Sequence, residues 1–322
     1  MEYEAILRIK EENKSLLFDK GPRIENISQV LTQVSNIIGV GIGEKTTKGV
    51  EGKLGIIVSV IKKLSKDELE KKRIIPESIE GVKTDVIETG VISAPPTAIP
   101  SEGLYNRVKR IKPAPPGCSI GHYKITCGTF GCVVKNKRGG EFILSNNHVL
   151  ANENDAEIGD DIFQPGPYDG GESPKDKIGE LDRFIPISFD EPNYVDCAIA
   201  KPEPLRTYRD LSPFIIGIGL PRRETVEPKL GMRLIKSGRT TGITRETIKQ
   251  TDLTVRIQYS NNRSATFDNQ IMAGYMSQGG DSGSLVLTND KRPVGLLFAG
   301  SPYSTIINPI EAVLRSLDVE IK

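Results

Sequence analysis

The sequence predicts a mainly β protein, in which a β-sandwich or barrel fills the C-terminal two thirds and a small α/β domain precedes it. Short runs rich in Val and Ile recur from residue 118 to the end, and clusters of Gly, Asn, Asp and Pro separate them. Short strands at this spacing are typical of all-β sandwiches and barrels, whereas βαβ units alternate strands with longer helical segments. A proline-rich stretch separates this part from the residues before it.

Residues 1–95 form the predicted α/β domain. Apolar residues between charged ones near the N-terminus predict an amphipathic helix, and β-branched runs further on predict buried strands. Ser65-Lys-Asp-Glu68 has the pattern of a capping box, which opens a short helix. The expected helices are 2–18 and 27–35, and the expected strands are 37–43, 53–62 and 82–91.

Glycine recurs in the strand expected over 37–43, which has the sequence Ile-Ile-Gly-Val-Gly-Ile-Gly. A phosphate-binding loop needs the Walker lysine, and a dinucleotide-binding loop needs a fuller glycine spacing. Neither pattern is present here. Turn formation or close packing of the backbone is therefore the expected role of these glycines.

Residues 96–117 are expected to form a linker. Prolines recur between Ala94 and Pro116, and each proline fixes φ and removes an amide donor. Such a stretch is predicted to be semi-rigid, with little regular structure. The β domain then covers 118–322 and ends in a helix expected over 307–317.

The composition is that of a soluble globular protein with a sizeable core. Apolar residues make up 37% of the chain, charged residues 26%, and the net charge is +1. No nucleic-acid partner is expected, because there is no basic excess. No membrane partner is expected, because no run approaches about 20 apolar residues. The N-terminus lacks the apolar core of a signal peptide, which predicts a cytoplasmic protein.

The four cysteines are expected to be reduced and mostly buried. A chain of this size has a core and does not need disulfides to hold it, and a free cysteine behaves as a small apolar residue. Because no Cys-x-x-Cys pair occurs, no structural zinc site is expected. The cysteines are Cys118, Cys127, Cys132 and Cys197.

The segment best suited to chemistry is Gln278-Gly-Gly-Asp-Ser-Gly-Ser-Leu-Val-Leu287. A nucleophilic serine needs a tight turn, a base within reach, and donors for the developing oxyanion. The glycines around Ser282 permit a sharp turn, on which the N–H groups of Gly280 and Ser282 would converge as an oxyanion hole. The alternative is a polar turn before a strand.

His148 is the candidate base. It ends the apolar run Phe142-Ile-Leu-Ser-Asn-Asn-His148, and the chain has only two histidines. The alternative for His148 is a half-buried histidine at a strand end. The other histidine, His122, lies within a predicted strand where nothing nearby completes a triad, so a structural or surface role is expected for it.

Asp196 is the candidate third member, within Tyr194-Val-Asp-Cys-Ala-Ile-Ala200. An aspartate among apolar residues is unfavourable unless its charge is hydrogen-bonded, and orienting an imidazole would meet that requirement. The alternative is an ordinary aspartate at a strand edge or turn. Asp190 lies nearby in the polar loop Phe-Asp-Glu-Pro-Asn and is expected to be solvated.

Together these motifs resemble the trypsin family. LSNNHVL, VDCAIA and GGDSGS are similar to that family's histidine, aspartate and serine motifs, and they follow in the same order. Subtilisins and α/β-hydrolases have the three residues in other orders. The resemblance covers residue 118 to the end and implies a chymotrypsin-like double β-barrel. The segments 117–132 and 236–242 also resemble a bacterial group related to plant narrow-leaf proteins.

The resemblance implies a serine endopeptidase with His148, Asp196 and Ser282 as its catalytic triad. Such an enzyme would hydrolyse polypeptides through an acyl-enzyme, without a metal or an organic cofactor. The strand over 295–300 would line the substrate cleft and pair with an extended peptide.

The resemblance also implies three substrate-binding residues, Met276, Phe298 and Gly300. Met276 would line the primary specificity pocket at a position where trypsin has an acid. This argues against a preference for Arg or Lys and favours a small or medium apolar side chain. Phe298 stands where the family usually has a serine, which would change how the triad aspartate is supported.

Asp281 marks a departure from the family. In secreted members, a freed N-terminal amine pairs with the aspartate before the nucleophile, but no activation site followed by Ile-Val-Gly-Gly occurs here. Either other groups hold Asp281, or the active site is unformed until something binds. The second possibility leaves an alternative function, a trypsin-fold binding or assembly module with little turnover. Residues 1–95 are expected to meet the chain's own barrel or another subunit, giving a closed monomer or a homo-oligomer.

Overall fold

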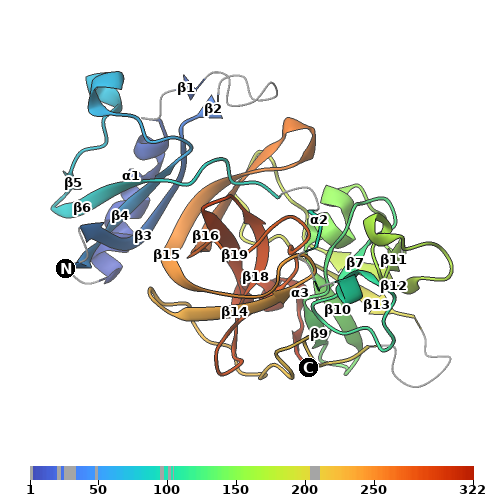
Figure 1. Ribbon diagram of the computed structural model, residues 1–322. Coiled ribbons are helices and arrows are strands. Elements are labelled where there is room, and N and C mark those ends of the chain that lie inside the picture. The colour runs from blue at the N-terminus through green and yellow to red at the C-terminus, as the bar shows by residue number, and fades with distance from the viewer. Residues whose placement is uncertain are drawn as a thin grey trace.

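The computed structural model describes residues 3–19, 23–24, 34–47, 50–94, 98–100, 103, 105–203 and 211–322. Within these residues the protein is mainly β, with two large curled sheets and few helices (Figure 1). The predicted fold class, a double β-barrel preceded by α/β structure, is confirmed.

The first barrel is built from short antiparallel strands. Its strands are β7 (Ser119–His122), β8 (Gly128–Thr129), β9 (Cys132–Lys135), β10 (Glu141–Ser145), β11 (Asp161–Phe163), β12 (Lys177–Phe184), β13 (Ala198–Pro202) and β20 (Glu320–Ile321). They are ordered β20-β9-β10-β13-β12-β11-β7-β8. The last strand of the chain, β20, thus returns to the first barrel and pairs with β9.

The second barrel closes on itself. Its strands are β14 (Arg233–Gly238), β15 (Gly242–Gln258), β16 (Ser264–Gly274), β17 (Leu285–Thr288), β18 (Pro293–Gly300) and β19 (Ser304–Pro309). They follow the order β14-β17-β18-β19-β16-β15, and an additional β14–β15 pairing joins the two ends. Strand β8 of the first barrel is bonded to the loop before β17 of the second barrel. Thr129 N donates to Ser282 O at 2.7 Å, and Thr129 Oγ1 donates to Gly280 O at 2.8 Å. The loop that carries Ser282 therefore lies at the junction between the barrels.

Three α-helices complete the described structure. They are α1 (Tyr3–Asp19), the single-turn α2 (Asn147–Leu150) and α3 (Ile310–Leu317). Six 3-10 turns lie at Lys66–Glu68, Lys71–Arg73, Tyr105–Val108, Asn152–Asn154, Pro167–Asp169 and Ser260–Asn262. Among these elements, none is a helix long and apolar enough to cross a membrane.

The N-terminal strands extend the sheet of the second barrel. They are β3 (Ile37–Thr47), β4 (Val50–Val60), β5 (Ser78–Ile79) and β6 (Val82–Glu88), with a separate pair, β1 (Arg23–Ile24) and β2 (Val34–Ser35). Strand β3 pairs antiparallel with β15, so one ten-stranded sheet runs from β14 to β5. Helix α1 packs on β3 and β4 through Ile6, Ile9 and Leu17 (Figure 1). The apolar strands therefore meet the chain's own barrel, one of the two partners expected.

The glycines of β3 permit this pairing. A Cβ on Gly43 would lie 2.7 Å from the carbonyl oxygen of Lys249 and 2.9 Å from Cγ1 of Ile57. Real Cβ atoms do not approach neighbours so closely, so only glycine lets β3 lie against β15. Close packing, one of the two roles expected for these glycines, is what the structure shows.

Most elements expected before residue 95 are present. The predicted helix over 2–18 is α1, the three predicted strands are β3, β4 and β6, and the capping box opens the 3-10 turn Lys66–Glu68. The helix expected over 27–35 falls mostly outside the described residues. Its last two residues, Val34 and Ser35, form β2 instead, so the prediction is wrong there. The C-terminal helix begins at Ile310, because β19 continues to Pro309.

The predicted linker makes more contacts than a spacer would. Its described residues hold one regular element, the 3-10 turn Tyr105–Val108. Arg107 is buried there and donates to Gly117 O at 3.0 Å and to Ser237 Oγ at 2.8 Å. The division of the chain at 95 and 117 stays a prediction, since the described parts are joined by a shared sheet and by such contacts. All four cysteines are buried and lie outside any disulfide, as predicted.

Candidate active site

His148 and Asp196 come together on the first barrel. His148 lies on α2, directly after β10, and Asp196 lies just before β13. The Nδ1 atom of His148 is 2.6 Å from Oδ2 of Asp196, and the backbone N–H of His148 donates to Oδ1 at 3.3 Å. Because a carboxylate only accepts hydrogen bonds, Nδ1 carries the proton and the neutral ring keeps a lone pair on Nε2. That is the tautomer a general base needs.

The charge of Asp196 is fully buried and well supplied with partners. Its exposed fraction is 0%, and besides His148 its Oδ2 accepts a 2.7 Å hydrogen bond from the hydroxyl of Tyr259. The backbone around it is fixed by Asn308 Oδ1, which accepts from Asp196 N at 3.0 Å, and by Asn146 Nδ2, which donates to Asp196 O at 2.8 Å. A buried aspartate is stable when it is hydrogen-bonded in this way.

Sequence reasoning missed Tyr259. This side chain is buried directly after β15, and burial, reinforced by the nearby Asp196 charge, raises its pKa well above the usual value. The phenol therefore stays protonated and remains a donor. The one available signal was Phe298, which stands where the resemblance to the trypsin family implies a serine hydroxyl as a donor to Asp196.

Ser282 lies on a tight turn before β17. Gly280 and Gly283 on either side of it have φ of 95° and 93°, which favours glycine. The exposed fraction of Ser282 is 4%. Its hydroxyl Oγ donates to the carbonyl of Phe298 at 3.4 Å, and within the described residues it makes no hydrogen bond to His148. The structure thus pairs His148 with Asp196 and places Ser282 at the barrel junction, with its hydroxyl turned to β18.

The amide groups expected to form the oxyanion hole are available. In the part of the chain that the structure describes, neither the N–H of Gly280 nor that of Ser282 donates to another protein atom. Their neighbours are engaged: Asp281 N donates to Gln278 O at 3.0 Å and Gly283 N to Leu297 O at 2.8 Å. The turn is therefore held in place while two donors are left for a ligand oxygen.

A buried ion pair holds Asp281. Lys236 Nζ lies 3.1 Å from Asp281 Oδ2, and both side chains are 0% exposed. Burial lowers the pKa of Lys236, and the Asp281 carboxylate opposes that shift. The carboxylate also accepts from Thr240 N at 2.9 Å and from Thr241 Oγ1 at 2.6 Å. Of the two possibilities left open for Asp281, the structure has the first, in which other groups of the chain hold it.

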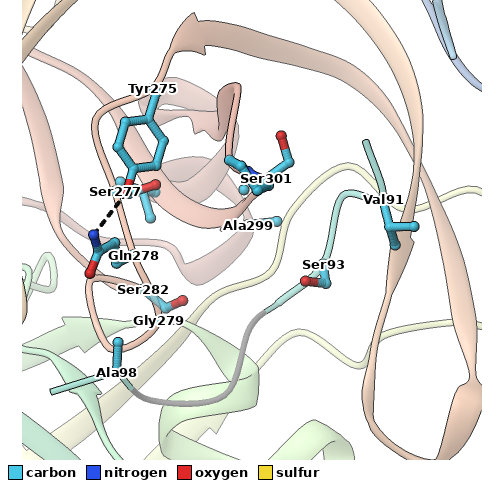
Figure 2. Close-up of a pocket in the computed structure, with 13 residues that line it drawn as sticks. Val91, Ser93, Ala98, Tyr275, Ser277, Gln278, Gly279, Ser282, Ala299 and Ser301 are labelled. Carbon is cyan, nitrogen blue, oxygen red and sulfur yellow. Dashed lines mark hydrogen bonds between the residues drawn. The ribbon is translucent and has the colours of Figure 1, made fainter. Parts of the chain in front are cut away.

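A cavity of about 330 Å³ opens beside Ser282 (Figure 2). The side chains that Figure 2 labels around it are small or polar, and no charged residue is among those that line it. The lining residues are Val91, Ser93, Ala98, Tyr275, Ser277, Gln278, Gly279, Ser282, Leu297, Ala299, Gly300, Ser301 and Pro302.

Two of the three residues expected to bind substrate do not line this cavity. Met276 is 2% exposed and packs in the core of the second barrel, among residues such as Leu234 and Ile271. Two hydrogen bonds hold its backbone: Thr305 Oγ1 accepts from Met276 N at 3.1 Å, and Thr244 Oγ1 donates to Met276 O at 2.7 Å. Met276 itself therefore faces the core, whereas its neighbours Tyr275 and Ser277 line the cavity.

Phe298 is also turned away from the cavity, and only its carbonyl reaches Ser282. Side chains alternate across a strand, so Leu297 and Ala299 of β18 line the cavity, while the Phe298 ring packs against Phe267 at a centroid distance of 4.8 Å. Gly300, the third expected residue, does line the cavity.

His122 and Asp190 both lie away from the pair formed by His148 and Asp196. His122 is 0% exposed, and its Nε2 lies 2.9 Å from Oδ2 of Asp160, which is a structural role away from the triad. Asp190 is exposed. Among the described residues, no group of three or more His, Cys, Asp or Glu side chains could hold a metal ion.

Comparison with known proteins places this architecture in a family. The trypsin family model matches residues 119–315, which is more than half of the chain. A comparison with curated proteins found no match.

Similar solved structures include three proteases. A glutamic-acid-specific serine protease has 17% identity and a TM-score of 0.46, and the match covers 65% of this chain and 100% of that one. The Nocardiopsis protease has 16% identity and a TM-score of 0.47, with 64% and 97% covered. Protease A of Thermobifida fusca has 17% identity and a TM-score of 0.46, with 64% and 96% covered.

Proposed function

Because the chain belongs to the trypsin family of serine proteases, we propose that it is a serine endopeptidase with Ser282 as nucleophile, His148 as base and Asp196 as orienting residue. The observation that carries this proposal is the 2.6 Å contact between His148 Nδ1 and the buried Asp196 Oδ2. It leaves Nε2 as the proton acceptor of the ring. It also gives the imidazolium that forms during the reaction a fixed counter-charge.

The reaction begins when the Ser282 hydroxyl leaves the Phe298 carbonyl and turns to Nε2 of His148. Its oxygen forms a bond to the substrate carbonyl carbon while Nε2 takes the proton. The N–H groups of Gly280 and Ser282 stabilise the resulting oxyanion. His148 then gives the proton to the leaving amine as the C–N bond breaks, and water releases the acyl group by the same steps in reverse order. No metal or organic cofactor takes part in these steps.

The cavity beside Ser282 supports a preference for uncharged side chains. Its lining includes no acidic residue to pair with a substrate Arg or Lys, and burying an unpaired cation is unfavourable. We propose that the substrate residue before the scissile bond has a small or medium-sized side chain.

The four cysteines, which lie outside any disulfide, support the expectation of a reducing compartment such as the cytoplasm. The pairing of β3 with β15 supports the closed monomer over the homo-oligomer.

The test is labelling with a fluorophosphonate, which modifies an activated serine. The wild type should be labelled at Ser282, and Ser282→Ala and His148→Ala should not be labelled. Ser301→Ala is the matched control, because Ser301 lines the same cavity and its hydroxyl lies 3.1 Å from that of Ser304. Asp196→Asn should fold and should lose about four orders of magnitude in turnover through the wrong imidazole tautomer.

One observation favours the alternative of a binding or assembly module. The Ser282 hydroxyl is bonded to Phe298 O and makes no hydrogen bond to His148 within the described residues. If a folded sample is never labelled at Ser282, the binding module replaces the endopeptidase.

A further inference from the structure

Residues 91–94, called the cleft segment here, lie beside the end of β18 and pair with it through a β-bridge at Ser93. Ser93 N donates to Gly300 O at 3.1 Å, and Gly300 N donates to Ser93 O at 2.9 Å. The pair is antiparallel. On its other side the segment is tied to the end of β15: Ala94 N donates to Gln258 O, and Gln258 N donates to Ile92 O, both at 3.0 Å.

The cleft segment borders the cavity that holds Ser282. Val91 and Ser93 line this cavity on the side away from Tyr275, as Figure 2 shows. Ala98 lines it near Gly279, to whose carbonyl Ala98 N donates at 2.9 Å. The carbonyl of Ala98 accepts from the guanidinium of Arg239. The chain is therefore fastened at two points around Ser282.

An apolar anchor holds the segment at its centre. The Ile92 side chain is 1% exposed and packs in the core cluster that contains Leu253 and Phe298. Ser93 next to it faces the cavity, because neighbouring side chains of an extended segment point in opposite directions. The segment thus has the form of a bound extended peptide, with one side chain buried below it and backbone hydrogen bonds to both flanking strands.

The bonds to Gly300 leave no place for a second peptide there. A residue at a strand edge presents one N–H and one C=O to an added strand. Both groups of Gly300 are taken by Ser93. An extended polypeptide that approaches Ser282 along β18 needs the same two groups, so it competes with Ser93.

We propose that the cleft segment occupies the substrate-strand position at Gly300 and has to leave it before an extended polypeptide binds. The protein is then held in an inhibited form by its own N-terminal part. The inhibitory effect rests on the proposed endopeptidase function, whereas the competition at Gly300 does not. A reagent that reaches only Ser282 and His148 does not need Gly300 and is not excluded.

The test uses the full chain with Ser93→Pro, which removes the N–H that donates to Gly300 O. Lys66→Pro is the matched control, because Lys66 is exposed and begins a 3-10 turn, where proline is tolerated. Ser93→Pro should raise kcat/KM for internally quenched peptides about tenfold, the effect of one lost hydrogen bond, and Lys66→Pro should not. Fluorophosphonate labelling of Ser282 should proceed equally in both variants and the wild type. An unchanged kcat/KM with normal labelling would overturn the proposal.

A binding measurement needs no turnover. In the Ser282→Ala background, a fluorescein-labelled peptide with the sequence of residues 89–98 should bind about tenfold more tightly when Ser93→Pro is added. Equal affinity would refute the competition. Tighter binding without any labelling at Ser282 would uphold the competition and reject the endopeptidase. If Ser93→Pro lowers the melting temperature strongly, Ile92→Ala is used in its place. This variant removes most of the buried anchor side chain and keeps every backbone N–H and C=O, and the same results are expected for it.

Discussion

The hydroxyl of Tyr259 and the imidazole of His148 donate to the same carboxylate oxygen, Oδ2 of Asp196, at 2.7 Å and 2.6 Å. The two rings are edge to face, with centroids 6.1 Å apart. Two donors from different barrels thus fix one oxygen. The orientation of the base depends on where the end of β15 lies.

Tyr259→Phe should lower kcat about tenfold or more and leave KM nearly unchanged. It removes a hydrogen bond to a buried charge, which is worth about 1.5–3 kcal/mol, but it leaves the substrate cavity intact. Steady-state kinetics with a peptide substrate measure the effect. Tyr194→Phe is the control, because that phenol is 60% exposed. A fall in kcat of the same size in both variants would contradict a positioning role for Tyr259.

Lys236→Met should destabilise the protein by about 3–5 kcal/mol, because it leaves the buried Asp281 without its counter-charge. Urea unfolding measures this loss. Fluorophosphonate labelling should slow as well, since Asp281 fixes the turn that carries Ser282. Adding Asp281→Asn removes the unpaired charge and should restore part of the free energy of unfolding. If the double variant is less stable than Lys236→Met, the ion-pair account is wrong.

His122→Gln should retain labelling at Ser282, because His122 bonds to Asp160 and lies outside the triad. Burial lowers the pKa of His122 below its usual 6.5, and Asp160 opposes the shift. The unfolded chain therefore binds the proton at a higher pH than the folded chain does. The corresponding stability is present above pH 6.5 and is lost as the pH falls through the folded pKa. Urea unfolding at pH 7.5 and pH 5 should show a smaller acid loss for His122→Gln than for the wild type.

The thiols should make the protein sensitive to alkali. Burial raises the pKa of Cys118 to about 12, from 9.0, so the folded chain keeps this proton where the unfolded chain loses it. The stability gained is present below pH 9 and is lost as the pH rises towards 12. Cys118→Ala should show a smaller fall in the free energy of unfolding between pH 8 and pH 10 than the wild type does.

A thiol reagent should find four free thiols after unfolding without reductant. A count of two or fewer would show that disulfides are present and contradict the prediction.

The sequence identified the candidate site residues whose neighbours in the chain form a recognisable pattern. The glycines around Ser282, the strand end at His148 and the apolar run at Asp196 each predict a local shape, and the structure has all three. Tyr259 and Lys236 have no such local signal, because their partners Asp196 and Asp281 are distant in sequence and meet them only in the assembled fold. The burial of Met276 could not be predicted for a related reason: its backbone bonds to Thr244 and Thr305 join residues that are distant in sequence.

For the N-terminal part, the sequence likewise predicts the elements but not the contacts between elements that are distant in the chain. Strand β3 could be expected from its β-branched residues and glycines. That it would pair with β15 depends on which edge of the barrel is free, and this is a property of the assembled fold.

The pairing of β3 with β15 has a consequence for any attempt to produce the barrels alone. Strand β3 covers the backbone of β15 at Gln250, Thr251, Thr254 and Val255. A fragment lacking residues 1–60 would present that row of amide and carbonyl groups to solvent as an open edge, the arrangement through which sheets join between molecules and aggregate. The N-terminal strands thus protect the solubility of the barrels by occupying the place where a second molecule would otherwise add.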